Sequence, residues 1–153
     1  MENVPLSFRE WCYPTKHKRN INCSWGNCGY IAISHKNIIT IYKFDGIKYT
    51  TFLSWSPYDT AEITAMGWLD GSCAPCESIP ILAVSFTNGS TLFFNLDDQV
   101  LIAKMKHNNQ IVKVIKWSPY NPNELFIGTD DGQLSICEML IGNENTTIKI
   151  REK

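Results

Sequence analysis

The chain has 153 residues, of which 44% are hydrophobic, and its formal net charge at pH 7 is −1. This composition excludes a disordered polymer and gives no sign of a general nucleic-acid or membrane-surface binder. Its apolar runs, such as residues 79–84, fall far short of the roughly 20 residues of a membrane span.

The first 20 residues are predicted to form an N-terminal arm. The start, MENVPLSFREWC, lacks the apolar segment of a secretory signal, so we expect an intracellular protein whose six cysteines are free thiols. Residues 16–19 are basic and lie near Trp11 and Tyr13, a combination that can touch RNA. An arm that packs across the fold is the favoured interpretation.

The rest of the chain is predicted to be β-structure almost throughout. Short β-branched and aromatic runs alternate with Gly, Asn, Asp and Pro, and no helical period is sustained. The expected strands are 30–34, 38–43, 48–54, 81–86, 91–96, 100–106, 112–117, 125–129, 133–139 and 146–150.

Three hairpins recur along the chain. Their turns are predicted at Lys36-Asn37, Asn88-Gly89 and Asp131-Gly132, where Asn-Gly and Asp-Gly favour tight turns and Asn37 takes the place of glycine.

A strand ending in tryptophan precedes each hairpin, and a further strand follows it. Trp25, Trp68 and Trp117 end these first strands, and we expect them to be structural residues. The sequence therefore predicts three four-stranded units at about 21–55, 60–107 and 110–151, the second lengthened by an insertion around Cys73 and Cys76.

A four-stranded unit of about 40 to 45 residues resembles a WD-repeat β-propeller blade. The stretch TDDGQLSICE, from Thr129 through Asp131 and Gly132 to Glu138, carries the resemblance best. The start Trp25-Gly26 with Gly29 resembles the opening blade of large scaffold proteins of this family.

The sequence departs from the WD pattern at several points. The closing Trp-Asp pair is replaced by Tyr42-Lys43, Phe94-Asn95 and Cys137-Glu138. The Gly-His before the first strand is absent, with His107 one residue out of place. Of the family's buried His–Ser/Thr–Asp–Trp network, only Thr129 and Asp131 have counterparts, so we expect blade stability to rest mostly on apolar packing.

The resemblance implies a ring, because propellers close with about 4 to 8 blades. Three blades form an open arc that exposes an apolar face at each end. Either further blades or a partner must complete the ring, and the favoured interpretation is that the chain is part of a longer protein.

The resemblance also implies that loops at one end of the blades bind partners. Trp55 and Tyr58 fall between two blades, so they are the partner-binding candidates, whereas Tyr120 falls at the opposite end. Alternatively, Trp55 fills the gap between two blades.

Metal binding and catalysis find little support. Cys73 and Cys76 form a C-x-x-C motif, but the nearest second pair, Cys23 and Cys28, lies in another unit, and the set of Cys12, His17 and Cys23 is looser still. We expect no metal, no cofactor and no enzymatic activity, since no catalytic motif occurs.

The predicted function is a non-catalytic protein–protein interaction scaffold, a propeller subunit whose partners are other subunits of a complex. The alternative is an RNA-binding propeller that uses the basic arm.

Overall fold

The computed structural model describes residues 21–26, 29–69, 80–121, 123–141 and 148–152. These residues form twelve strands and no helix, arranged as three antiparallel sheets of four strands each. The predicted all-β fold and the three-bladed arc are therefore confirmed.

The first sheet is a simple meander. It runs in the order β1 (Ile21–Trp25), β2 (Tyr30–His35), β3 (Ile38–Phe44) and β4 (Tyr49–Trp55).

The other two sheets repeat this order. The second sheet holds β5 (Ile63–Trp68), β6 (Ile81–Phe86), β7 (Ser90–Asn95) and β8 (Val100–Lys106). The third holds β9 (Val112–Trp117), β10 (Glu124–Thr129), β11 (Leu134–Ile141) and β12 (Ile148–Glu152). Strand β12 ends two residues later than the sequence predicted.

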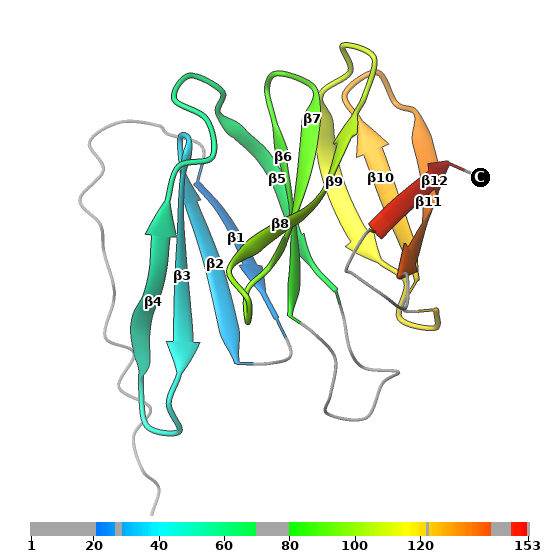
Figure 1. Cartoon of the computed structure of the whole chain (residues 1–153). Coiled ribbons are helices and arrows are strands. Elements are labelled where there is room, and N and C mark those ends of the chain that lie inside the picture. The colour runs from blue at the N-terminus through cyan, green and yellow to red at the C-terminus, as the bar shows by residue number, and fades with distance from the viewer. Residues whose placement is uncertain (1–20, 27–28, 70–79, 122, 142–147, 153) are drawn as a thin grey trace, which may run out of the picture.

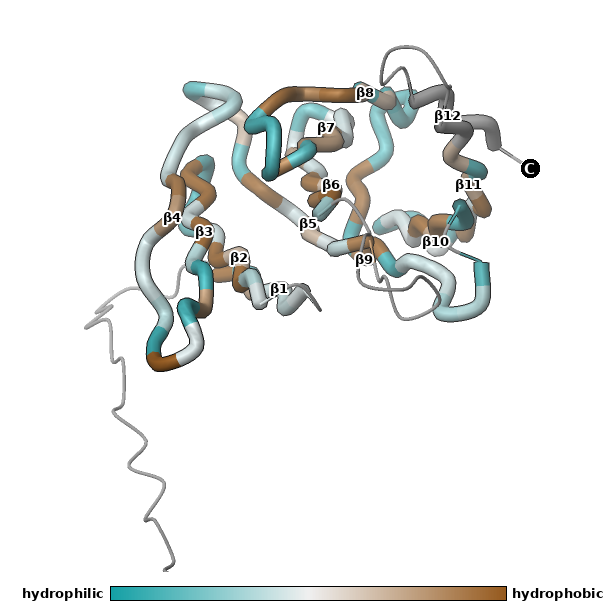
Figure 2. The backbone as a smooth tube through the Cα atoms, turned by 60° about the horizontal axis from the view of Figure 1, so that its bottom comes forward, coloured by the Kyte–Doolittle hydropathy of each residue, from teal (hydrophilic) through white to brown (hydrophobic). Residues whose placement is uncertain are grey.

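The sheets radiate like blades from their first strands. Seen from the end, β1, β5 and β9 lie side by side, and each sheet extends outward from them to β4, β8 or β12 (Figure 2). The arc is open, because the first and third sheets each pack against a neighbouring sheet on only one of their two faces.

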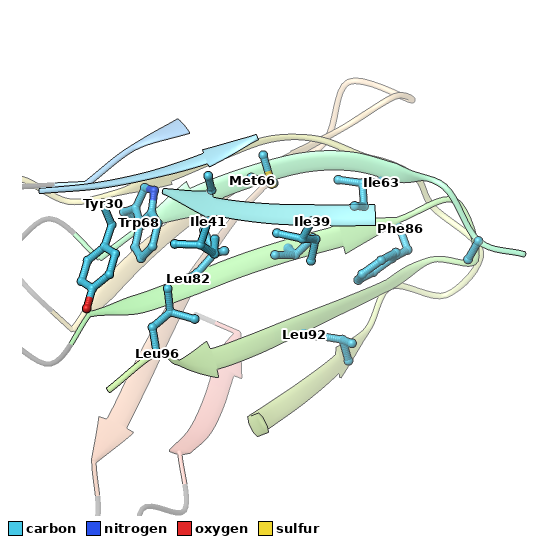
Figure 3. Packing of buried hydrophobic residues seen from close by; sticks show 13 residues of the cluster. Tyr30, Ile39, Ile41, Ile63, Met66, Trp68, Leu82, Phe86, Leu92 and Leu96 are labelled. Carbon is cyan, nitrogen blue, oxygen red and sulfur yellow. The ribbon is translucent and has the colours of Figure 1, made fainter. Parts of the chain in front are cut away.

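The pattern of buried residues along the strands agrees with an open arc. In β2 buried and half-buried residues alternate, as expected for a strand with one covered face. In β6 all six residues are buried, because the second sheet lies between its two neighbours. The core accordingly divides into one cluster between the first two sheets (Figure 3) and another between the last two.

The three predicted hairpin turns are present, with one correction. Gly89 and Gly132 adopt φ of 72° and 83°, the left-handed region that favours glycine. In the first turn the left-handed residue is Lys36, with φ of 56°, and not Asn37 as the sequence suggested. A positive φ at the first central residue suits a two-residue hairpin, and it leaves the Asn37 side chain available for another purpose.

Candidate protein-interaction surface

The hairpin turns and the loops between sheets lie at the same end of the blades. We call this end the hairpin face. It consists of the turns β2–β3, β6–β7 and β10–β11 and the loops β4–β5 and β8–β9, all at the top of Figure 1.

Asn37 ties the β4–β5 loop to the first hairpin. Its Nδ2 lies 2.9 Å from Ser56 Oγ, 2.9 Å from the Tyr58 carbonyl oxygen and 3.0 Å from the Asp59 carbonyl oxygen. The Ser56 hydroxyl in turn lies within hydrogen-bonding distance of the carbonyl oxygens of Asn37 and Tyr58. One amide side chain therefore fixes the path of the loop that carries Tyr58.

The same loop is joined to the second hairpin. The backbone N–H of Thr87 donates to the Glu62 carbonyl oxygen at 2.8 Å, and the backbone N–H of Glu62 donates to Thr87 Oγ1 at 3.0 Å. Loop β8–β9 follows this pattern, because the backbone N–H of His107 donates to the Gly89 carbonyl oxygen and the backbone N–H of Asp130 donates to the Ile111 carbonyl oxygen. Each interblade loop is thus held between the hairpin turns.

Tyr58 is half-buried, with its ring edge-to-face against Phe86 at 4.9 Å between centroids. Its hydroxyl accepts a hydrogen bond from Ser90 Oγ at 3.3 Å, and Lys104 Nζ lies 5.4 Å from the ring centroid. Burial alone would raise the pKa of the Tyr58 hydroxyl, but Lys104, Ser90 and Asn88 outweigh that effect and lower the pKa. The result is a fixed aromatic side chain beside a cation.

Trp55 is half-buried, like Tyr58, and packs between the first two sheets. It pairs with Ile39 across strands, packs against the cluster between those sheets, and meets Phe94 edge-to-face at 5.2 Å. This position is the blade-gap site that the sequence analysis gave as the alternative.

A polar set that the sequence analysis did not identify lies inside the second sheet. Ser85 Oγ is 2.5 Å from Thr91 Oγ1, and Thr91 Oγ1 is 2.8 Å from His107 Nε2, with all three residues buried. The histidine that appeared one residue out of place therefore takes part in a buried His–Thr–Ser set of the second sheet.

Thr129 and Asp131 do contact each other, at the third hairpin. The Thr129 hydroxyl donates to Asp131 Oδ1 at 2.5 Å, and Gln110 Nε2 donates to Asp131 Oδ2 at 2.7 Å. The Thr129 hydroxyl is the main reason that the pKa of Asp131 is lowered, and Gln110 lowers it further. Unlike the buried set of the second sheet, this pair lies at the surface beside Gly132, with Thr129 half-buried and Asp131 exposed.

The first-strand tryptophans gather at the opposite end of the blades. Trp68 Nε1 donates to the Ser24 carbonyl oxygen at 2.9 Å, and Trp117 Nε1 donates to the Gly67 carbonyl oxygen at 3.4 Å. Each indole thus bonds to the residue that precedes the tryptophan of the previous sheet.

The three tryptophans differ in exposure. Trp68 and Trp117 are 7% and 6% exposed, whereas Trp25 is 68% exposed. They line a pocket of about 120 Å³ together with Ser24, Gly67, Ile115 and Lys116. Tyr120, in the β9–β10 loop at this end, is 90% exposed.

Cys23 is a free thiol, and partial burial raises its pKa. Cys12, His17, Cys28, Cys73 and Cys76 lie outside the described residues, so the metal prediction stays a prediction. Within the part of the chain that the structure describes, no three His, Cys, Asp or Glu side chains group as metal ligands would. That same part contains no helix able to cross a membrane.

The fold is similar to that of chains in solved structures of Polycomb Repressive Complex 2. One, titled "Chaetomium thermophilum Polycomb Repressive Complex 2 bound to GSK126", matches with a TM-score of 0.61 and 16% identity over 79% of this chain and 28% of that chain. Another, titled "Structure of ctPRC2 in complex with H3K27me3 and H3K27M", matches with a TM-score of 0.64 and 15% identity over 78% of this chain and 27% of that chain.

This chain therefore spans about a quarter of the length of the chains that it matches. No protein family and no curated protein matches the sequence. At such low identity the similarity shows a shared propeller-like fold.

Proposed function

We propose that the chain is part of a non-catalytic, WD-repeat-type scaffold that binds another protein through its hairpin face. The observation that carries the proposal is the set of hydrogen bonds from Asn37, which holds the loop bearing Tyr58. A loop fixed before binding loses little conformational entropy when a partner docks, so more of the contact energy remains as affinity.

Tyr58 is the residue proposed to contact the partner. Tyrosine is enriched among the residues that dominate interface energies, because it offers a large apolar ring with a polar end. Here the ring is braced by Phe86, and Lys104 adds a positive charge. The surface suits a partner segment that presents a carboxylate or carbonyl oxygen beside an apolar side chain. Trp55 supports the loop that carries Tyr58, because it packs between the first two sheets at the residue before that loop begins.

The polar groups of this face also explain why we propose no catalysis. Asn37, Ser56, Thr87 and Asp131 all hydrogen-bond to loop or turn atoms. A general base or nucleophile needs a lone pair directed at a substrate, whereas these side chains maintain the shape of a docking surface.

Residues 1–20 are proposed as an arm and residues 21–153 as three blades of an intracellular propeller subunit. Membership of a multi-protein complex accords with the fold similarity to chains of Polycomb Repressive Complex 2. The RNA-binding alternative depends on Trp11, Tyr13 and the basic residues 16–19, which lie outside the described residues.

The test is quantitative capture of proteins from cell extract by the wild-type chain, Tyr58→Ala and Tyr120→Ala, each with matching thermal melting. A partner identified with the wild type is then titrated against each variant. Tyr58→Ala is expected to weaken binding by about 1 to 2 kcal/mol, and Tyr120→Ala to leave it unchanged. Equal affinity of Tyr58→Ala and wild type, or selective loss with Tyr120→Ala, places the binding surface elsewhere. A gel shift with single-stranded RNA at two salt concentrations tests the alternative.

A further inference from the structure

The outer strands of the three sheets are unevenly spaced. Strand β8 turns towards β12 and contacts it, whereas β4 stands away from β8 (Figure 2). We call the side of the molecule that lies between β4 and β8 the rim. It runs along the outer strands of the first two sheets and meets the hairpin face at Tyr58.

The rim is apolar at its base and partly apolar at its surface. Leu53, Trp55 and Phe94 are half-buried and pack against the core cluster between the first two sheets. Leu101 lies opposite Phe94 in the pairing of β7 with β8, so it shares that face of the sheet, and it is 53% exposed. Phe52 of β4 is 37% exposed.

Two lysines of β8 lie on the same face. Lys104 is paired with Leu92, a member of the core cluster between the first two sheets, and Lys106 lies two residues further along the strand. Both side chains are exposed, and Lys104 Nζ lies 5.4 Å from the ring centroid of Tyr58.

A third lysine lies on the first sheet. Lys43 is exposed, and its Nζ lies 5.1 Å from the ring centroid of Tyr30 and 5.6 Å from that of Phe52. Tyr30 belongs to the same core cluster, so this ammonium group also stands on the side that faces the second sheet. The Tyr30 hydroxyl chiefly, and Asp97 more weakly, raise the pKa of Lys43.

The positive charge of the rim is not neutralised by its own strands. Neither β4, with the sequence YTTFLSW, nor β8, with the sequence VLIAKMK, contains Asp or Glu. Within the described part of the chain, none of the three lysines forms an ion pair. Exposed apolar side chains framed by unpaired cations are complementary to a ligand that is both apolar and acidic.

We propose that the rim binds an extended, acidic segment of another protein, with apolar side chains against Phe94 and Leu101 and carboxylates beside Lys43 and Lys104. The strands β4 and β8 have seven residues each, so a segment of about eight residues spans the rim. This site goes beyond the proposed function, because it lies along the sheets and needs no contact with the hairpin turns.

Two other occupants fit the rim less well. The ammonium groups of Lys43 and Lys104 stand over the rings of Tyr30 and Tyr58, where the bases of an RNA would otherwise stack. Residues 1–20 contain four Lys or Arg and two Glu, so their net charge has the same sign as that of the rim.

Fluorescence anisotropy of a labelled peptide of about eight residues, in which leucine alternates with glutamate, measures binding to the full chain. Leu101→Glu is expected to weaken binding at least about tenfold, because it removes an apolar contact and adds repulsion. Lys43→Gln is expected to weaken it about threefold, the scale of an exposed ion pair. Lys113→Gln is the matched control, because Lys113 is an exposed lysine of β9, and it is expected to bind like the wild type. Circular dichroism checks that the variants fold.

Binding by the wild type at chain concentrations up to about 200 µM, with this order of variants, supports the proposal. Absence of binding overturns it, and so does an equal loss with Lys113→Gln or equal binding of a peptide with lysine in place of glutamate. Tighter binding of an oligouridylate of matching length, or of a peptide of residues 1–20, assigns the rim to RNA or to the chain itself and also overturns it. A wild-type dimer that Leu101→Glu separates assigns the rim to a second copy, with the same consequence.

The probe is a synthetic peptide and not a partner from cell extract. Loss of peptide binding therefore leaves the hairpin-face proposal standing, and a failure of the Tyr58→Ala test leaves the rim proposal standing.

Discussion

Trp68 donates its indole N–H to the carbonyl oxygen of Ser24, 44 residues earlier, at 2.9 Å. The bond joins the innermost strands of two sheets, and Gly26 lies against the same indole. A Cβ added to Gly26 would stand 2.9 Å from Cδ2 of that ring, closer than real Cβ atoms approach.

Gly26→Ala is therefore expected to destabilise the chain by about 1 to 3 kcal/mol, the scale of overpacking. Gly128→Ala is the matched control, because its nearest neighbour would be Val114 Cβ at 3.6 Å, an ordinary contact. Urea unfolding of both variants measures the difference. Equal stability of the two variants would show that Trp68 moves aside at no cost.

The exchange of Thr for Val is expected to have opposite effects at two positions whose hydroxyl oxygens are buried. Thr91→Val removes the hydroxyl that lies between Ser85 and His107, so it should cost about 1 to 3 kcal/mol. Thr64 Oγ1 is buried with no hydrogen-bond partner, so Thr64→Val should be neutral or stabilise the fold by up to about 1 kcal/mol. Equilibrium unfolding gives both values, and a destabilising Thr64→Val would contradict the assignment of an unsatisfied hydroxyl.

Asn37→Asp keeps the size of the side chain but removes its N–H donors. The β4–β5 loop is expected to loosen, because Ser56, Tyr58 and Asp59 lose their shared donor. Hydrogen exchange of the backbone N–H groups in residues 58–62 should speed up, while exchange in β6 stays at the wild-type rate. Unchanged exchange in the loop would mean that Asn37 does not determine its path.

Acid is expected to weaken the third hairpin through Asp131. The pKa of this carboxyl is lowered in the folded chain, chiefly by the Thr129 hydroxyl, so its contribution is present above the unfolded pKa of about 3.9. That contribution is lost as the pH falls through the lower folded value. Asp131→Asn should therefore be less stable than wild type at pH 7, with the difference shrinking towards pH 2.

Thr129→Val should reproduce part of the Asp131→Asn effect, because it removes the main hydrogen bond to the carboxylate. Unfolding by urea at several pH values measures both variants. A difference between wild type and Asp131→Asn that stays constant from pH 7 to pH 2 would contradict the prediction.

The sequence predicted the three sheets because turn chemistry is local. Gly89 and Gly132 mark turn positions that need positive φ, and the alternation of apolar and polar residues on either side predicts the strands. The first turn was only partly predictable, since the choice of Lys36 over Asn37 as the left-handed residue depends on where the Asn37 side chain finds its partners.

The site was less accessible to sequence reasoning, for a different reason. The WD pattern places its histidine at a fixed offset from the first strand, whereas the contact of His107 with Thr91 depends on the path of the β8–β9 loop, where Asn109 adopts φ of 66°. The sequence predicts the same structural role for Trp25, Trp68 and Trp117. Their different exposure follows from which sheets stand beside them, and a single unit of the repeat does not contain that information.

The indole-to-carbonyl bonds between neighbouring sheets also bear on how such a chain can lengthen. The second sheet presents a donor, Trp68 Nε1, on one side and an acceptor, the Gly67 carbonyl oxygen, on the other. Repetition of residues 56–106 within the gene would add a Trp68 facing a second Gly67, so that the indole-to-carbonyl bond already present between neighbouring sheets is repeated at the new contact. Duplication of a blade therefore keeps the hydrogen bond that joins the inner strands of adjacent blades.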